Sequence, residues 1–216
     1  MTNVSPERKT RKTTISLEEL EAMREAASQL SDEFYILRTK ALLALLYLTG
    51  KRVSEICRLE LTDFKVSGGM LNVTFTLSKK RKETVLLKQA IKAIPLTDLL
   101  TQPIIEYINH LQGMNPMPRY FLPRTRPVFG ASYIIDPEHG IGRGQLWNLI
   151  HAVTNEAWPH LFRETAGAEI IRKDPTIIGV FKVKQRLDHE DLKTSMGYLA
   201  RYAADIIDRE EAKANG

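Results

Sequence analysis

The sequence predicts a mainly α-helical fold with a small antiparallel β-sheet, an α+β class in which helices dominate. Segments near residues 16–27 and 31–48 carry apolar residues at the spacing of helices that bury one or more faces. Residues 71–77 instead alternate apolar and polar side chains, which is typical of a strand with one buried face. Helical patterns return near residues 98–112 and again toward the C-terminus, so the sheet is the smaller component.

The first two helices have recognisable ends. Ser16 and Glu19 have the spacing of a capping box, which predicts that the first helix begins there. The second helix, residues 31–48, is nearly all apolar in its last two turns and is therefore predicted to be buried. It stops at Gly50, a residue suited to a left-handed C-cap. A short helix restarts in the segment VSEICRLEL, so Arg52 lies at a junction between two helices.

The predicted sheet lies near residues 69–88 and centres on a β-hairpin. Its first strand is residues 71–77, and the apolar segment TVLL, residues 84–87, is a candidate for the second. The sequence SKKRKE between them breaks the alternation, so residues 78–83 are predicted to form the tip of the hairpin. This tip carries four consecutive cations, which are Lys79, Lys80, Arg81 and Lys82.

The rest of the chain divides into an irregular part and a helical part. Residues 113–143 are rich in proline and glycine, which predicts a long irregular connection. From about residue 145 the chain is predicted to be helical. Breaks are expected near Pro159 and Pro175, because proline interrupts a helix, and at residues 187–190.

Composition and charge favour an intracellular protein with a polyanionic partner. The 216 residues include 31 lysines and arginines against 26 aspartates and glutamates, which gives a net charge of +5 and a pI of about 9.3. The longest apolar run, residues 41–48, is too short to span a bilayer, and the N-terminus lacks the apolar core of a secretory signal. The single cysteine, Cys57, excludes an internal disulfide. We expect an intracellular, nucleoid-associated protein with a flexible basic arm, residues 1–15, before a domain spanning residues 16–216.

Three segments resemble the catalytic domain of the tyrosine recombinase family, the phage integrase type. They are LLYLTGKRVSEICRLELTDF, WPHLFRETAGAEI and RLDHEDLKTSMGYLARY, and the resemblance covers roughly residues 16–205. It implies the fold of that catalytic domain and site-specific exchange of DNA strands. It also implies the site residues, which are Arg52 with Glu55 as a supporting carboxylate, Lys79 on the hairpin, His160 and Arg163 in a His-x-x-Arg pair, His189, and Tyr198 nine residues after it.

These residue types suit attack on a phosphodiester. Two guanidiniums, Arg52 and Arg163, can grip the non-bridging oxygens and stabilise the charge of the transition state. The Tyr198 phenolate is a usable nucleophile, and its ester with the 3′-phosphate conserves the bond energy for rejoining. Lys79 can donate a proton to the departing 5′-oxygen, while Lys80, Arg81 and Lys82 contact DNA. The scheme needs neither a metal ion nor a cofactor.

Several of these assignments have alternatives. Tyr202 lies one helical turn after Tyr198, and only the nine-residue spacing favours Tyr198. Lys80 or Lys82 could take the role of Lys79. Asp188 stands where the family usually has glycine, and we expect it to act as the N-cap of the next helix. Rival functions are a type IB topoisomerase-like relaxase and a DNA-binding protein of the same fold that does not cut.

The resemblance also implies how such a protein assembles. The partner is double-stranded DNA, and we expect a monomer free in solution that becomes a tetramer on DNA. A C-terminal helix, about residues 201–213, is a candidate for linking protomers, with packing in its own domain as the alternative. Family members usually carry an N-terminal core-binding domain, and we expect it to be absent here because only the basic arm precedes the catalytic fold.

Overall fold

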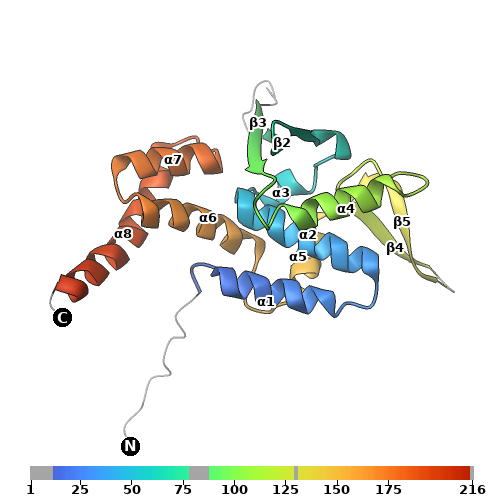
Figure 1. Cartoon of the computed structure of the whole chain (residues 1–216), viewed down its shortest axis with the longest axis horizontal. Coiled ribbons are helices and arrows are strands. Elements are labelled where there is room, and N and C mark those ends of the chain that lie inside the picture. The colour runs from blue at the N-terminus through green and yellow to red at the C-terminus, as the bar shows by residue number, and fades with distance from the viewer. Residues whose placement is uncertain (1–11, 78–87, 129–130, 215–216) are drawn as a thin grey trace, which may run out of the picture.

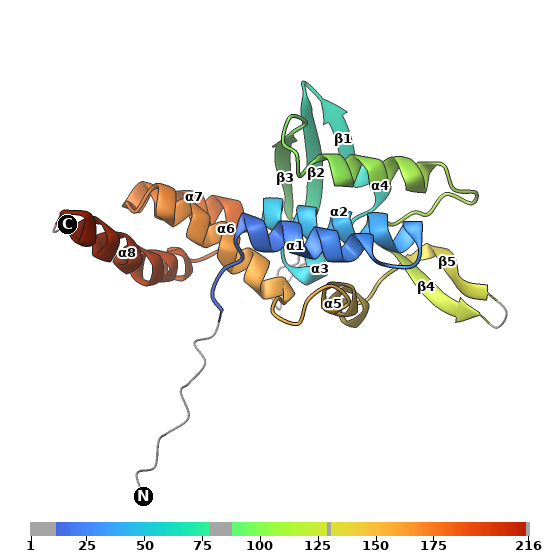
Figure 2. The same cartoon turned by 60° about the horizontal axis from the view of Figure 1, so that its bottom comes forward.

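Figures 1 and 2 show a computed structural model of the chain, which describes residues 12–77, 88–128 and 131–214. Helices dominate and the strands form two small antiparallel sheets, which confirms the predicted fold class. None of the helices in these described parts is long and apolar enough to cross a membrane. The elements in chain order are α1 (Leu17–Ser28), α2 (Glu33–Thr49), α3 (Val53–Ile56), the 3-10 helix η1 (Leu61–Asp63), β1 (Phe64–Ser67), β2 (Met70–Leu77), β3 (Lys88–Pro95), α4 (Gln102–Gln112), β4 (Pro123–Val128), β5 (Ala131–Gly140), α5 (Arg143–His151), α6 (Pro159–Lys173), α7 (Ile177–Leu187) and α8 (Leu192–Ala214).

The ends of α1 and α2 confirm the predicted capping. The Ser16 hydroxyl accepts the Glu19 backbone N–H at 3.2 Å, and the Glu19 carboxylate accepts the Ser16 N–H at 2.8 Å. Helix α2 begins after Asp32, whose carboxylate accepts the Phe34 N–H, and it ends at Gly50 in the left-handed conformation, with φ of 61°. Because Gly50 stops α2 at a fixed point, the residues that follow it start from a defined position.

The first sheet has the order β1-β2-β3. Strand β2 pairs antiparallel with β3, with Met70 opposite Pro95 and Leu77 opposite Lys88. The second strand of the predicted hairpin, β3, therefore continues to residue 95, beyond the predicted limit of the sheet near residue 88. The sequence underestimates this strand because Lys88 and Lys92 interrupt its apolar pattern. The segment TVLL and the four cations of the predicted tip, Lys79 to Lys82, lie outside the described residues.

Strands β4 and β5 form a hairpin in the region that the sequence predicts to be irregular, so that prediction is wrong for residues 123–140. Pro123, Pro127 and Pro137 suggest an absence of strands because proline has no N–H to donate. In a two-stranded sheet, however, each strand has an unpaired edge where no N–H is needed. The register also shifts at two places along this pair, which obscures the alternation in the sequence.

The described part of the domain has two apolar clusters. The larger one is formed by α1, α2 and α4 with the inner face of β2, and Leu42, Leu45 and Phe75 are fully buried in it. The smaller one joins α6, α7 and α8 and includes Ile171 and Val183. Figures 1 and 2 show α7 and α8 to one side of the main body, with α6 leading from one part to the other. Residues on α6 are therefore placed to contact both.

The chain packs against the domain before Ser16. Ile15 is buried, and its N–H donates to the Thr165 hydroxyl on α6 at 2.8 Å. The Thr13 carbonyl lies 3.4 Å from the Tyr202 hydroxyl on α8. Residues 12–15, predicted as the end of a flexible arm, are thus part of the packed structure, because Ile15 is an apolar side chain that the arm cannot leave exposed without cost.

Candidate active site

Arg52 lies between α2 and α3, as the sequence predicts. It is the N-cap of α3, and its side chain is about half exposed, at 48%. The buried carboxylate of Glu55 accepts from Arg52 twice, from the guanidinium at 3.1 Å and from the backbone N–H at 3.0 Å. Gly50 allows this junction to approach α6, since a Cβ at that position would lie only 2.7 Å from the Cβ of Ala166. Glu55 therefore orients Arg52 while leaving part of its guanidinium accessible.

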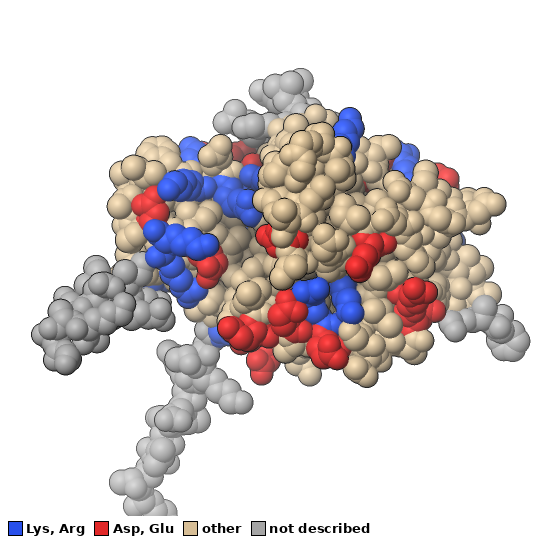
Figure 3. Space-filling view, in the orientation of Figure 1, with Lys and Arg blue, Asp and Glu red and all other residues tan. Residues whose placement is uncertain are grey.

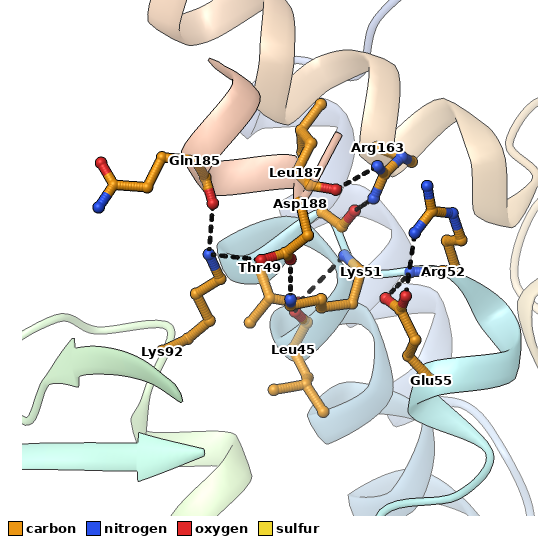
Figure 4. Close-up of polar contacts among 11 residues, drawn as sticks. Leu45, Thr49, Lys51, Arg52, Glu55, Lys92, Arg163, Gln185, Leu187 and Asp188 are labelled. Carbon is orange, nitrogen blue, oxygen red and sulfur yellow. Dashed lines mark hydrogen bonds and ion pairs between the residues drawn. The ribbon is translucent and has the colours of Figure 1, made fainter. Parts of the chain in front are cut away.

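Arg163 joins three segments that are far apart in the sequence. Its side chain is buried, and its guanidinium donates to the carbonyl oxygen of Gly50 at 2.9 Å and to that of Leu187 at the end of α7 (Figure 4). Burial, followed by the charge of Arg52, lowers the pKa of Arg163, although an arginine remains charged at neutral pH. These hydrogen bonds hold the Arg163 guanidinium near that of Arg52.

Both arginines and His160 line one cavity of about 320 Å³. His160 lies at the start of α6, is 66% exposed on its side chain, and shares this lining with Lys51 and Arg143. Neither Glu55 nor any other acidic residue is among the described residues that line it. A small concave site surrounded by cations is suited to binding an anion such as a phosphate.

Asp188 ends α7 and does not start α8, which corrects the predicted N-cap role. It adopts the left-handed conformation, with φ of 52°, and its N–H caps α7 by donating to the Lys184 carbonyl. This conformation explains why glycine suits the position. The Asp188 carboxylate forms an ion pair with the fully buried ammonium of Lys51 and lies 3.9 Å from that of Lys92 on β3 (Figure 4).

Lys51 and Lys92 are neighbours of the site that the sequence analysis did not identify. Burial lowers the pKa of Lys51, and burial together with the charge of Lys51 lowers the pKa of Lys92 to about 8. Lys92 also donates to the Gln185 carbonyl at 3.0 Å, so β3 is tied to α7. The available signal was a pair of opposite charges, Lys51 and Asp188, each directly beside a predicted site residue.

Asp188→Asn is expected to lower the free energy of unfolding by about 3 kcal/mol, because it leaves a buried ammonium without its carboxylate. Asparagine tolerates the left-handed conformation, so backbone strain does not contribute. Burial already lowers the pKa of Lys51, so the folded variant favours neutral Lys51. The loss of unfolding free energy relative to the wild type should therefore shrink as pH rises toward the ordinary lysine pKa of about 10.4.

Urea denaturation of the wild type, Asp188→Asn and the double variant Lys51→Met/Asp188→Asn, at about pH 7 and about pH 10, measures this effect. The double variant should recover most of the loss, because neither charge remains buried. A deficit that is equal at both pH values and persists in the double variant would contradict the ion-pair explanation.

His189 is buried near Tyr198 and the two arginines of the site. Its Nδ1 lies 2.9 Å from the Ser195 hydroxyl, and its ring centroid lies 5.8 Å from that of Tyr198. Burial, followed by the charges of Arg163 and Arg52, lowers the pKa of His189 to about 4. The imidazole is therefore neutral at pH 7, with one nitrogen that donates and one that accepts.

Tyr198 is buried on α8 against α6. Its ring lies on Gly167, where a Cβ would come within 2.2 Å of the ring atom Cε1. Its hydroxyl donates to the Glu164 carboxylate at 3.3 Å. Burial, followed by the charge of Glu164, raises the pKa of the Tyr198 phenol above its ordinary value. Glu164 is a third neighbour of the site that the sequence analysis did not identify.

The structure thus brings together six of the seven residues predicted for catalysis or its support. Arg52, Glu55, His160 and Arg163 surround or adjoin the cavity, while His189 and Tyr198 lie on the α7–α8 side of Arg163 and are absent from the described lining. Lys79 lies outside the described residues, as do Lys80, Arg81 and Lys82. Among the residues described, no three of histidine, cysteine, aspartate or glutamate are grouped so as to hold a metal ion.

Comparisons with known proteins show the family of the chain. Residues 13–204 match the sequence model of the Phage integrase family. A tyrosine recombinase of Pseudothermotoga lettingae is 25% identical over 177 residues, which are 82% of this chain and 52% of the relative. A tyrosine recombinase of Thermosipho africanus is 28% identical, over 76% of this chain and 50% of the relative. The chain spans about half the length of the curated relatives it matches.

Solved structures support the fold. The crystal structure of XerA recombinase matches with a TM-score of 0.61 and 20% identity, covering 93% of this chain and 66% of that one. XerH site-specific recombinase bound to its difH substrate matches with a TM-score of 0.57 and 17% identity, covering 91% and 52%. The fold of this chain is therefore one that these solved recombinases share.

Proposed function

This chain belongs to the phage integrase family of tyrosine recombinases, and from that premise we propose that it cuts and rejoins DNA strands through a covalent bond between Tyr198 and a backbone phosphate. The reaction is site-specific strand exchange. Tyr198 attacks the phosphate, the 5′-oxygen leaves, and the 3′-phosphotyrosine is later attacked by the 5′-hydroxyl of a partner strand. Because the ester conserves the energy of the broken bond, rejoining needs no nucleotide cofactor.

One observation carries this proposal, namely the convergence of Arg52, His160 and Arg163 on a single cation-lined cavity. A phosphodiester resists attack because it is anionic. Two fixed guanidiniums in the cavity can bind its non-bridging oxygens and stabilise the charge that develops in the transition state. A donor of this kind contributes about a hundredfold or more to the rate.

The other site residues take complementary roles. Neutral His189 and the exposed His160 can hydrogen-bond the phosphate. Glu55 keeps Arg52 oriented. Lys79 is proposed as the acid that gives a proton to the 5′-oxygen, and Lys80, Arg81 and Lys82 as contacts to the DNA backbone.

Double-stranded DNA is the proposed substrate. The net charge of +5 favours a polyanion, and on the face shown in Figure 3 lysine and arginine side chains gather over α6 and α7. The XerH structure, which shares the fold, is a complex with its difH DNA substrate. A tetramer on two duplexes, formed from monomers and linked by the C-terminal helix, remains the prediction for the assembled state.

The test is covalent trapping. The protein is incubated with nicked duplexes in EDTA, and adducts are detected on a denaturing gel and located by peptide mass. We expect an adduct at Tyr198 despite the chelator, because the arginines supply the positive charge that metal ions supply in many nucleases.

Three other outcomes would contradict this mechanism or favour a different function. DNA binding without any adduct would favour a non-cleaving DNA-binding protein. Cleavage that requires added magnesium would contradict the arginine mechanism. Relaxation of supercoiled plasmid without transfer to a partner strand would favour a topoisomerase-like enzyme.

A further inference from the structure

Glu164 lies between the proposed nucleophile and the cation-lined cavity. Its Oε1 atom accepts the Tyr198 hydroxyl at 3.3 Å and lies 3.2 Å from Nε2 of His160, which lines the cavity. Its side chain is only 16% exposed. One carboxylate oxygen therefore contacts both the tyrosine that would attack the phosphate and a histidine that would contact it.

The second carboxylate oxygen holds Glu164 in this place. Oε2 accepts a hydrogen bond from Arg201 on α8 at 2.7 Å and lies 3.5 Å from the Tyr202 hydroxyl. The Arg201 ion pair thus fixes the orientation of the carboxylate from the α8 side. Glu164 directly follows Arg163 on α6, so successive positions of one helix supply a phosphate clamp and a proton acceptor.

The chemistry of the buried tyrosine calls for such an acceptor. Burial and the nearby carboxylate raise the pKa of the phenol, so the ionised nucleophile is rare at neutral pH. The proton must then leave as the oxygen forms its bond to phosphorus. In the described part of the chain, the carboxylate of Glu164 is the acidic side chain hydrogen-bonded to the Tyr198 hydroxyl.

We propose that Glu164 is a catalytic residue, the general base that takes the proton of Tyr198 during strand cleavage; this inference rests on the proposed function. As the bond from the Tyr198 oxygen to phosphorus forms, the O–H bond breaks and the proton passes to Oε1 of Glu164. The bond from phosphorus to the 5′-oxygen breaks, and that oxygen takes a proton from an ammonium, proposed as Lys79. In rejoining, both protons return, so Glu164 and the lysine are regenerated.

The decisive variant is Glu164→Gln, which keeps the shape of the side chain and an oxygen that accepts a hydrogen bond but does not accept a proton. Single-turnover adduct formation on nicked duplex should slow by about a hundredfold at pH 7. The rate of the variant should then rise by roughly tenfold per pH unit, because its tyrosine must ionise to solvent. The wild-type rate should stay nearly level between about pH 7 and about pH 9. A purely structural loss would lower the rate equally at every pH.

Glu169→Gln is the matched control. Glu169 lies on the same helix, is 42% exposed on its side chain and pairs with Arg172 at 3.3 Å. Its variant should keep the wild-type rate and pH profile. Melting temperature and DNA affinity are measured for both variants, so that a folding defect is recognised.

Several results would overturn the proposal. A rate of adduct formation in Glu164→Gln that equals the wild-type rate would show that the carboxylate is not the base. A rate that exceeds it would show that the carboxylate restrains the tyrosine instead of activating it. If Glu164→Gln fails to fold, the wild-type profile decides, since a wild-type rate that itself climbs tenfold per pH unit excludes a carboxylate base. Failure of the proposed function differs from all of these, because then the wild type forms no adduct at any pH.

Discussion

Tyr198→Phe is expected to abolish the covalent adduct with DNA, because it removes the attacking oxygen and keeps the ring that packs on Gly167. DNA affinity should stay within about twofold of the wild type, since the lost hydroxyl contacts Glu164 and not the cavity. Stability should change by less than about 1 kcal/mol, the usual size of one hydrogen bond. Adducts on a denaturing gel and a titration with labelled duplex measure these quantities.

Tyr202→Phe is the control for this experiment. Tyr202 lies one turn later on α8, its ring centroid is 6.2 Å from that of Tyr198, and its hydroxyl faces the Thr13 carbonyl at 3.4 Å. The hydroxyl also lies 3.5 Å from Oε2 of Glu164, which is not the oxygen that accepts the Tyr198 hydroxyl, so the variant should retain cleavage. If Tyr202→Phe lost the adduct and Tyr198→Phe kept it, the nucleophile would be the residue one turn further along.

Gly167→Ala should prevent adduct formation almost as completely. The added Cβ would lie 2.2 Å, 2.5 Å and 2.9 Å from three atoms of the Tyr198 ring, so the ring or the whole of α8 must move. A displacement of about 1 Å at the nucleophile can cost about a hundredfold in rate. Overpacking should also lower the free energy of unfolding by about 2 kcal/mol. The rate of adduct formation and urea denaturation measure the two effects.

Gly197→Ala offers a matched comparison on the facing helix. A Cβ at Gly197 meets no described atom within 4 Å, and alanine stabilises a helix interior relative to glycine by about 0.5–1 kcal/mol. This variant should gain stability and keep Tyr198 in place. Equal effects of the two substitutions would mean that Tyr198 does not depend on close contact with α6.

The sequence was most informative where local chemistry determines structure. The capping box at Ser16 and the C-cap at Gly50 are local signals, and both are present in the structure. Arg52 lies at the predicted helix junction because Gly50 ends one helix immediately before it. The spacing between His189 and Tyr198 likewise places both side chains in one buried cluster beside Arg163.

Features that depend on contacts between distant segments could not be predicted. The ion pair of Lys51 with Asp188 joins residues 137 positions apart, and although each stands beside a predicted site residue, the sequence does not show that the two meet. Glu164 contacts Tyr198 across the α6–α8 interface, which the helical pattern of either segment does not specify. The β4–β5 hairpin depends on pairing that its prolines obscure locally. In each case the tertiary contact, and not local preference, determines the outcome.

The two main-chain bonds of Arg163 couple the position of its guanidinium to the packing of α2, α6 and α7. The guanidinium is held by the carbonyls that end α2 and α7, so its orientation exists only while those two helix ends stay together. If α7 and α8 moved away from α6 together, Arg163 would lose its bond to Leu187 and Tyr198 would lose its contact with Gly167. Local opening of this region is therefore expected to displace the Arg163 guanidinium and Tyr198 together, and under the proposed function strand cleavage needs both.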